Sequence, residues 1–105
     1  MGPELGDLGR FSEPALLILV SLADGPKHGY AMMEDIEALC GVRLGPGTLY
    51  GALARLERRG LIAPLEAEDR RRPYRLTQAG VATLRAQLAG LDALARAGLQ
   101  RLAGT

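Results

Sequence analysis

The stretch over residues 45–76 constrains the fold most, because a helix, a helix-ending glycine and a charged hairpin follow one another directly. A helix over residues 46–59 is predicted by apolar side chains three or four positions apart, namely Leu49, Ala52, Leu53 and Leu56. Gly60 then stands where a helix usually ends, since glycine adopts the left-handed conformation without a Cβ clash.

The opposite side of this predicted helix is small near its start and basic further along, with Gly51, Ala54, Arg55 and Arg58. Residues 61–65 form a short apolar run that suits a strand, although Pro64 fits only an edge strand. Residues 66–72 are a charged tip that ends in three arginines, and residues 73–76 suit a return strand. The pattern predicts a winged helix-turn-helix fold of mainly α (α+β) class, with a three-helix core, a two-stranded wing and a long C-terminal helix.

Several motifs in this stretch resemble the PadR family of bacterial transcriptional regulators. They are Gly47-Thr48-Leu49-Tyr50, Leu56-Glu57-Arg58-Arg59-Gly60-Leu61-Ile62 and Tyr74-Arg75-Leu76-Thr77-Gln78-Ala79-Gly80, preceded by Gly25-Pro26 and His28-Gly29-Tyr30. These motifs occur in the family's order and cover roughly residues 15–80. The chain departs from the family at Gly51, where a proline is frequent.

The resemblance implies a dimeric regulator, a repressor in our interpretation, that binds double-stranded DNA at a pseudo-palindromic operator. It implies that the helix over residues 46–59 enters the major groove while the wing follows the backbone. The residues expected to contact DNA are Thr48, Tyr50, Gly51, Ala54, Arg55, Arg58, Arg70, Arg71, Arg72 and Arg75.

The distribution of charge is more informative than the net charge, which is only +1. Residues 1–42 hold two basic and seven acidic side chains, whereas residues 43–75 hold eight arginines and four acids. The basic charge is thus concentrated on the predicted helix and hairpin, as expected of a surface that contacts DNA.

The remaining N-terminal half supplies the other core helices. Residues 1–10 are rich in glycine and predict a flexible arm, so we expect the DNA-binding domain to span residues 11–76. Helices are expected over residues 15–23, with Ser12 as N-cap, and over residues 29–39. In the second helix we expect Met32, Met33, Ile36 and Leu39 to point into the core, and Glu34, Asp35 and Glu37 to point into solvent. We also expect Tyr30 to have a packing role and Cys40 to be a small buried apolar residue.

In residues 77–105 we predict a dimerisation helix that begins after Thr77 and runs from Gln78 to Ala103. Its length would be about 39 Å at 1.5 Å per residue. Its apolar stripe extends beyond the small core and therefore needs a partner. The residues expected at the dimer interface, two of them on the first helix, are Leu16, Leu19, Val81, Leu84, Leu88, Leu91, Ala95, Leu99 and Leu102.

Other classes of protein are disfavoured. No nucleophile–base set and no phosphate-binding glycine loop can be assigned, so we expect no enzyme activity and no cofactor. His28 and Cys40 are the only residues of their types, and a metal site is therefore not expected. Residues 1–10 do not resemble a signal peptide, and the apolar run at residues 15–20 is too short to span a membrane. We expect a cytoplasmic protein.

Two alternative functions stay open at this point. One is a winged-helix protein–protein interaction module whose arginine face meets an acidic partner. The other is a drug-sensing regulator with a ligand cavity at the dimer interface, although one Phe, three Tyr and no Trp provide few aromatic surfaces for a flat ligand. If an effector exists, we expect it at or near the dimer interface, and the few aromatic residues favour a small or aliphatic effector, or a partner protein, over a planar polyaromatic drug.

Overall fold

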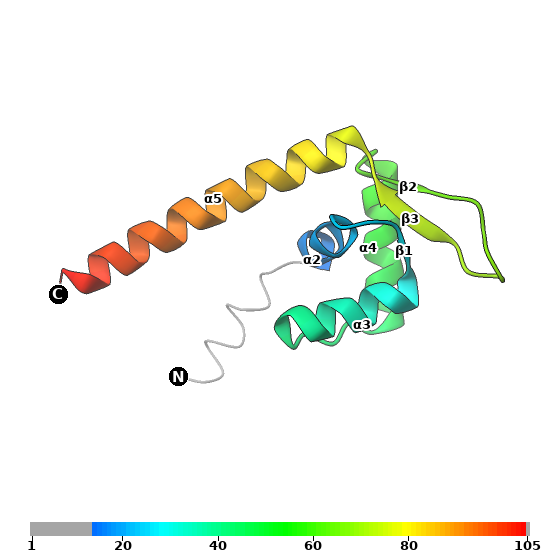
Figure 1. Ribbon diagram of the computed structural model, residues 1–105, viewed down its shortest axis with the longest axis horizontal. Coiled ribbons are helices and arrows are strands. Elements are labelled where there is room, and N and C mark those ends of the chain that lie inside the picture. The colour runs from blue at the N-terminus through cyan, green and yellow to red at the C-terminus, as the bar shows by residue number, and fades with distance from the viewer. Residues whose placement is uncertain (1–13, 105) are drawn as a thin grey trace.

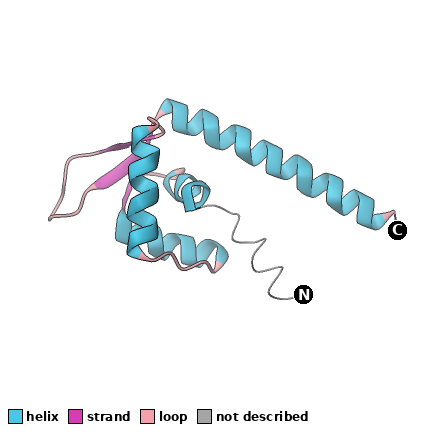
Figure 2. Cartoon of the chain, turned by 180° about the vertical axis from the view of Figure 1, so that it is seen from behind, coloured by secondary structure: helices cyan, strands magenta, loops and turns pink. Residues whose placement is uncertain are grey.

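A computed structural model describes residues 14–104, in which a small sheet lies at the edge of a group of short helices and one long helix extends away from them (Figures 1 and 2). The order of the elements is α2 (Pro14–Leu22), β1 (Lys27–His28), α3 (Gly29–Cys40), α4 (Pro46–Arg58), β2 (Ile62–Pro64), β3 (Pro73–Leu76) and α5 (Gln78–Ala103). The predicted N-terminal arm and the predicted cap at Ser12 lie outside the described residues. The mainly helical winged-helix fold predicted from the sequence is confirmed.

The core forms where α2, α3 and α4 pack together, as the apolar patterns of these helices predicted. Each helix contributes side chains that are buried, and single residues from β2 and α5 close the cluster. The buried apolar residues are Ile18, Leu19, Leu22, Met32, Ile36, Leu44, Leu49, Ala52, Leu53, Leu56, Ile62 and Leu84.

The helix ends follow local signals. Gly41 and Gly60 both have φ of 74°, the left-handed conformation that favours glycine, directly after α3 and at the end of α4. Thr77 caps α5, because its Oγ1 accepts a hydrogen bond from the Gly80 N–H at 3.0 Å. His28 caps α3 in the same way, and its Nδ1 accepts from the Ala31 N–H at 3.3 Å.

The sheet has one strand more than the predicted two-stranded wing. Its order is β1-β3-β2 and all pairs are antiparallel, with Lys27 opposite Tyr74 and Ile62 opposite Leu76. The predicted two-stranded wing is the hairpin of β2 and β3, whereas β1 was not predicted because it is only two residues long and shows no alternation of its own. Pro64 does lie in an edge strand, as predicted.

Four predictions for residues 29–40 were wrong. Leu39 and Cys40 are exposed, because the last turn of α3 extends past the core that Met32 and Ile36 join. Asp35 is half-buried rather than outward, because its carboxylate accepts a hydrogen bond from Ser21 at 2.6 Å. Tyr30 is exposed rather than packed in the core.

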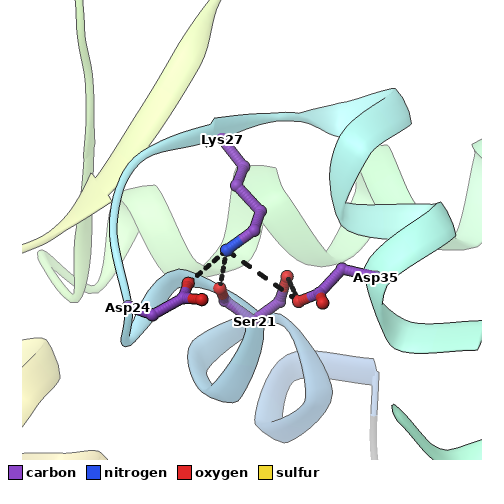
Figure 3. Close-up of polar contacts among 4 residues, drawn as sticks. All are labelled: Ser21, Asp24, Lys27 and Asp35. Carbon is purple, nitrogen blue, oxygen red and sulfur yellow. Dashed lines mark hydrogen bonds and ion pairs between the residues drawn. The ribbon is translucent and has the colours of Figure 1, made fainter. Parts of the chain in front are cut away.

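A polar cluster joins α2 to β1 and α3 (Figure 3). The Lys27 ammonium donates to the carbonyl oxygen of Ser21 and to the carboxylate of Asp24, and it lies 3.9 Å from the carboxylate of Asp35. Ser21 is in the last turn of α2, where carbonyls lack intrahelical partners, so the lysine satisfies one of them. The lysine also holds the pKa of the Asp24 carboxyl below its ordinary value.

The helix α5 begins against the sheet and then leaves the rest of the protein (Figures 1 and 2). Its predicted bounds, Gln78 and Ala103, agree with the structure. Only Gly80 and Leu84 in this helix are buried, and both are in its first two turns. Within the described residues, no helix is long and apolar enough to cross a membrane.

Candidate nucleic-acid interface

The helix α4 has one side buried in the core and the opposite side exposed to solvent. Its four buried residues are the apolar ones predicted, and Pro46 at its start suits the first helical turn. All of the α4 residues predicted to contact DNA are exposed, namely Thr48, Tyr50, Gly51, Ala54, Arg55 and Arg58. A Cβ added to Gly51 would meet only the Arg55 guanidinium, at 3.9 Å, so the surface beside Gly51 is open. Because Gly51 and Ala54 are small, another molecule can approach the helix backbone closely beside them.

The wing presents the second group of predicted residues, and Arg70, Arg71, Arg72 and Arg75 are all exposed. Its tip is a tight hairpin in which Glu68 and Arg71 exchange backbone hydrogen bonds of 2.7 and 2.8 Å. Asp69 and Arg70, the two residues of the turn, have φ of 48° and 67°, the positive values that a two-residue hairpin turn requires. The tip therefore has a defined backbone that projects its arginines outward.

Two wing arginines are positioned by backbone carbonyls. Arg72 donates to the carbonyl of Leu65 at 3.2 Å, and Arg75 donates to that of Leu76 at 3.1 Å. A guanidinium has five N–H donors, so most of its donors stay available to an anion. These bonds orient the arginines without neutralising their charge.

A pocket of about 310 Å³ lies between the wing, α4 and the start of α3. It collects all three tyrosines of the chain together with three arginines and the only histidine, and its lining is His28, Gly29, Tyr30, Tyr50, Arg70, Arg71, Arg72 and Tyr74. Burial raises the pKa of the Tyr74 phenol, and the Glu57 carboxylate adds to this while Arg72 opposes it. The Tyr74 hydroxyl therefore stays protonated at neutral pH.

The sequence interpretation missed part of this pocket. Of its lining residues, His28, Tyr30 and Tyr74 were not predicted to be functional, although two belong to the His28-Gly29-Tyr30 motif. The available signal was that tyrosine is rare in this chain and that two tyrosines lie in the motifs nearest the arginines.

The residues predicted at the dimer interface divide into two groups. Leu19 and Leu84 are only 2% and 5% exposed, so the chain's own core already uses them and little surface is left for a partner. This part of the prediction needs correction. Leu16 is half-buried, and the other members are exposed: Val81, Leu88, Leu91, Ala95, Leu99 and Leu102. Leu94, outside the predicted stripe, is exposed as well.

These features define a winged-helix protein whose α4 and wing present exposed arginines. Residues 18–86 match the transcriptional regulator PadR-like family, and the chain belongs to that family. Its members are transcriptional regulators rather than enzymes, which agrees with the expected absence of catalysis.

Two relatives resemble the chain in sequence, and one of them is itself named a transcriptional regulator. A transcriptional regulator of Mycobacterium tuberculosis is 40% identical over 87 residues, which cover 77% of this chain and 78% of the relative. An uncharacterised 37.1 kDa protein in a transposon of Streptomyces fradiae is 56% identical over 71 residues, and this chain spans 21% of its length.

Solved structures share the architecture. A PadR family transcriptional regulator from Eggerthella lenta superposes with a TM-score of 0.79 at 30% identity, covering 99% of this chain and 92% of that one. A transcriptional regulator from Clostridium thermocellum superposes with a TM-score of 0.74 at 28% identity, covering 87% of this chain and 90% of that one.

Proposed function

We propose that this regulator is a homodimeric repressor that binds a pseudo-palindromic operator through α4 and the wing. The observation that carries the proposal is that α4 and the wing lie at one end of the molecule while α5 leads away from it (Figures 1 and 2), and that the arginines of both elements are exposed. A surface of this kind suits the phosphates and groove edges of a duplex.

The two parts of this surface suit different roles. Gly51 and Ala54 allow the backbone of α4 to approach base edges, where Arg55 or Arg58 can donate two hydrogen bonds to a guanine. The wing arginines project from a hairpin tip and suit phosphates, which carry no sequence information. We therefore assign base reading to α4 and positioning to the wing.

Dimerisation is supported by the exposed apolar side chains of α5. Leu99 and Leu102 are 68% and 71% exposed, and they continue the stripe of Val81, Leu88 and Leu91. Burying these side chains against a second copy removes apolar surface from water, about 25 cal/mol for each Å². A dimer with two-fold symmetry would present two α4 helices to half-sites about one helical turn, or a multiple of it, apart.

A cavity of about 530 Å³ between α2, α4 and α5 supports a site for a small effector. Leu16, Leu91 and Leu94 line it, so it lies next to the proposed dimer interface. No aromatic side chain is among the residues that line this cavity in the described chain, which favours an aliphatic ligand over a planar drug. An occupant there would alter the angle of α5 and hence the spacing of the two α4 helices.

Selection of bound duplexes from a random pool tests the proposal. We expect an inverted repeat whose half-sites are separated as a two-fold dimer requires. Recovery of a single asymmetric site would contradict the dimeric mode. Absence of any binding to random duplex at low salt would contradict DNA binding itself and would favour the interaction-module alternative.

A further inference from the structure

The His28 imidazole lies between two N–H donors. Its Nδ1 accepts from the Ala31 N–H at 3.3 Å and caps α3, while its Nε2 lies 3.4 Å from Nη1 of Arg71 in the wing. A neutral imidazole has one acceptor nitrogen and one N–H donor. Because the capping bond needs Nδ1 as the acceptor, the hydrogen belongs on Nε2. The Nε2–H group and the guanidinium therefore face each other as two donors.

Two donors that face each other are best satisfied by an oxygen anion between them. The arginine cannot give up its proton, so it cannot become the acceptor. An anionic oxygen would accept from both groups at once, and the capping bond of α3 would be kept. Bonds from such donors to an ionised oxygen are about twice as strong as bonds between neutral groups.

The surroundings of this position favour an anion. The 310 Å³ pocket that contains it is lined by Arg70 and Arg72 in addition to Arg71, and no carboxylate is among its lining residues in the described chain. A neighbouring cavity shares His28 and Arg71 with this pocket but is also lined by the carboxylates of Glu68 and Asp69, beside Lys27, so it suits an anion less well. The start of α3 adds the positive end of a helix dipole.

Tyr50 closes the pocket from the side of α4. Its hydroxyl lies so near Gly29 that a Cβ added to the glycine would fall 2.5 Å from that oxygen. The glycine thus allows a hydroxyl donor from α4 to lie at the first turn of α3. The pocket thereby brings donors from α3, α4 and the wing to one place.

We propose that this pocket binds a single phosphate of the DNA backbone, with His28 donating through Nε2 while its Nδ1 caps α3. The inference rests on the proposed DNA-binding function and adds His28 as a residue that contacts the phosphate. The phosphate joins Arg71 to the first turn of α3, so DNA binding fixes the wing relative to the helix-turn-helix.

The tautomer is measurable directly, because His28 is the only histidine and every imidazole signal therefore belongs to it. Nitrogen-15 NMR of the labelled protein should show the Nε2–H tautomer. Adding a short random-sequence duplex at low salt should move the Nε2–H signal and slow its exchange with water. A ring protonated on Nδ1 alone would overturn the inference. Inorganic phosphate at the same ionic strength should give a weaker change, and an equal change would mean that the pocket binds free phosphate instead.

A variant separates the cap from the contact. His28→Asn keeps a side chain that caps helices well but has no donor at the Nε2 position. We expect an unchanged melting temperature and about a tenfold loss of affinity for random duplex, the effect of one hydrogen bond to a charged group. His28→Ala should lose affinity equally and should also melt earlier. In an Arg71→Ala background, His28→Asn should cost less than it does alone, because the two donors share one oxygen.

The outcomes distinguish this inference from the proposed function. If the wild type binds random duplex and His28→Asn binds it equally well, the phosphate contact is wrong and the DNA-binding function stands. If the wild type itself does not bind, both proposals fall.

Discussion

Gly80 packs against the backbone of Leu61, so that a Cβ built on the glycine would lie 2.0 Å from the Leu61 carbonyl oxygen. The same carbonyl accepts a hydrogen bond from the Thr77 N–H at 3.1 Å, and the Thr77 hydroxyl donates to the carbonyl of Gly60 at 2.6 Å. These contacts attach the first turn of α5 to the segment that ends α4. The direction of α5 relative to the proposed DNA-binding face is therefore set at Gly80.

We expect Gly80→Ala to destabilise the protein by about 1–3 kcal/mol or more, because the obstructing atom is backbone and cannot rotate away. Gly90→Ala is the matched control in the same helix. Nothing lies within 4 Å of its added Cβ, so alanine should stabilise the helix by up to about 1 kcal/mol. Urea unfolding at one protein concentration measures the stability of both variants. If both substitutions changed the free energy of unfolding by the same amount in the same direction, the proposed contact would be contradicted.

The wing tip allows stability and DNA affinity to be separated at one residue. Arg70 has φ of 67°, which costs an arginine about 1–2 kcal/mol and glycine almost nothing. Arg70→Gly should therefore raise the melting temperature while weakening binding to operator and random duplex alike. Arg70→Ala should weaken binding equally without raising the melting temperature. Thermal unfolding and a duplex titration decide this, and equal melting temperatures for the two variants would count against the strained turn.

The contact between Lys27 and Asp24 predicts a pH dependence. Because the folded pKa of Asp24 lies below its ordinary value of 3.8, the ion pair stabilises the fold above that value. The stabilisation is lost as the pH falls through the folded pKa. Wild type should thus exceed Asp24→Asn in stability at neutral pH, and the difference should vanish in acid. A difference that persists below the folded pKa would assign the effect to something other than this charge.

The dimer prediction concerns the exposed stripe of α5. Wild type should sediment as a dimer at low micromolar concentration, and Leu99→Glu should shift it to monomer because a charge would be buried at the interface. Gln100→Glu places the same charge one residue away, off the stripe, and should leave the dimer intact. Leu84→Ala should instead lower the stability of the fold by about 2–5 kcal/mol, since Leu84 lies in the core. A monomeric wild type would contradict the stripe as an interface.

The features that were predicted well from the sequence depend on signals from residues that are close together in the chain. The bounds of α5, its Thr77 cap and the glycine after α4 follow from residues within one or two turns of each other. The features it missed depend on contacts between distant residues. Asp35 is half-buried because of Ser21, fourteen positions away, and β1 exists only through its pairing with β3.

The candidate site shows the same division. Every residue predicted to contact DNA is exposed, because the helical period identifies the outer side of α4 and the charge pattern identifies the wing. The pocket around His28 and Tyr74 was not predicted, since β1, α3, α4, the wing tip and β3 come together only when the chain folds.

The central claim is that the face formed by α4 and the wing is the DNA-contacting surface, and a salt titration of duplex binding tests it most directly. Replacing Arg70, Arg71 and Arg72 with alanine should weaken binding to operator and random duplex alike, and each lost phosphate contact should flatten the log–log salt slope by about 0.9. The matched control replaces the three arginines of α5, Arg85, Arg96 and Arg101, which removes the same charge and should leave the slope nearly unchanged.

Arg55→Ala belongs in the same titration. It should cost about 1–3 kcal/mol at the operator and much less on random duplex, because this arginine is assigned to a base edge. Equal losses on both duplexes would mean that α4 contacts only the backbone. An equal change of slope for the wing variant and the α5 control would contradict the central claim, because DNA affinity would then follow the overall charge rather than this face.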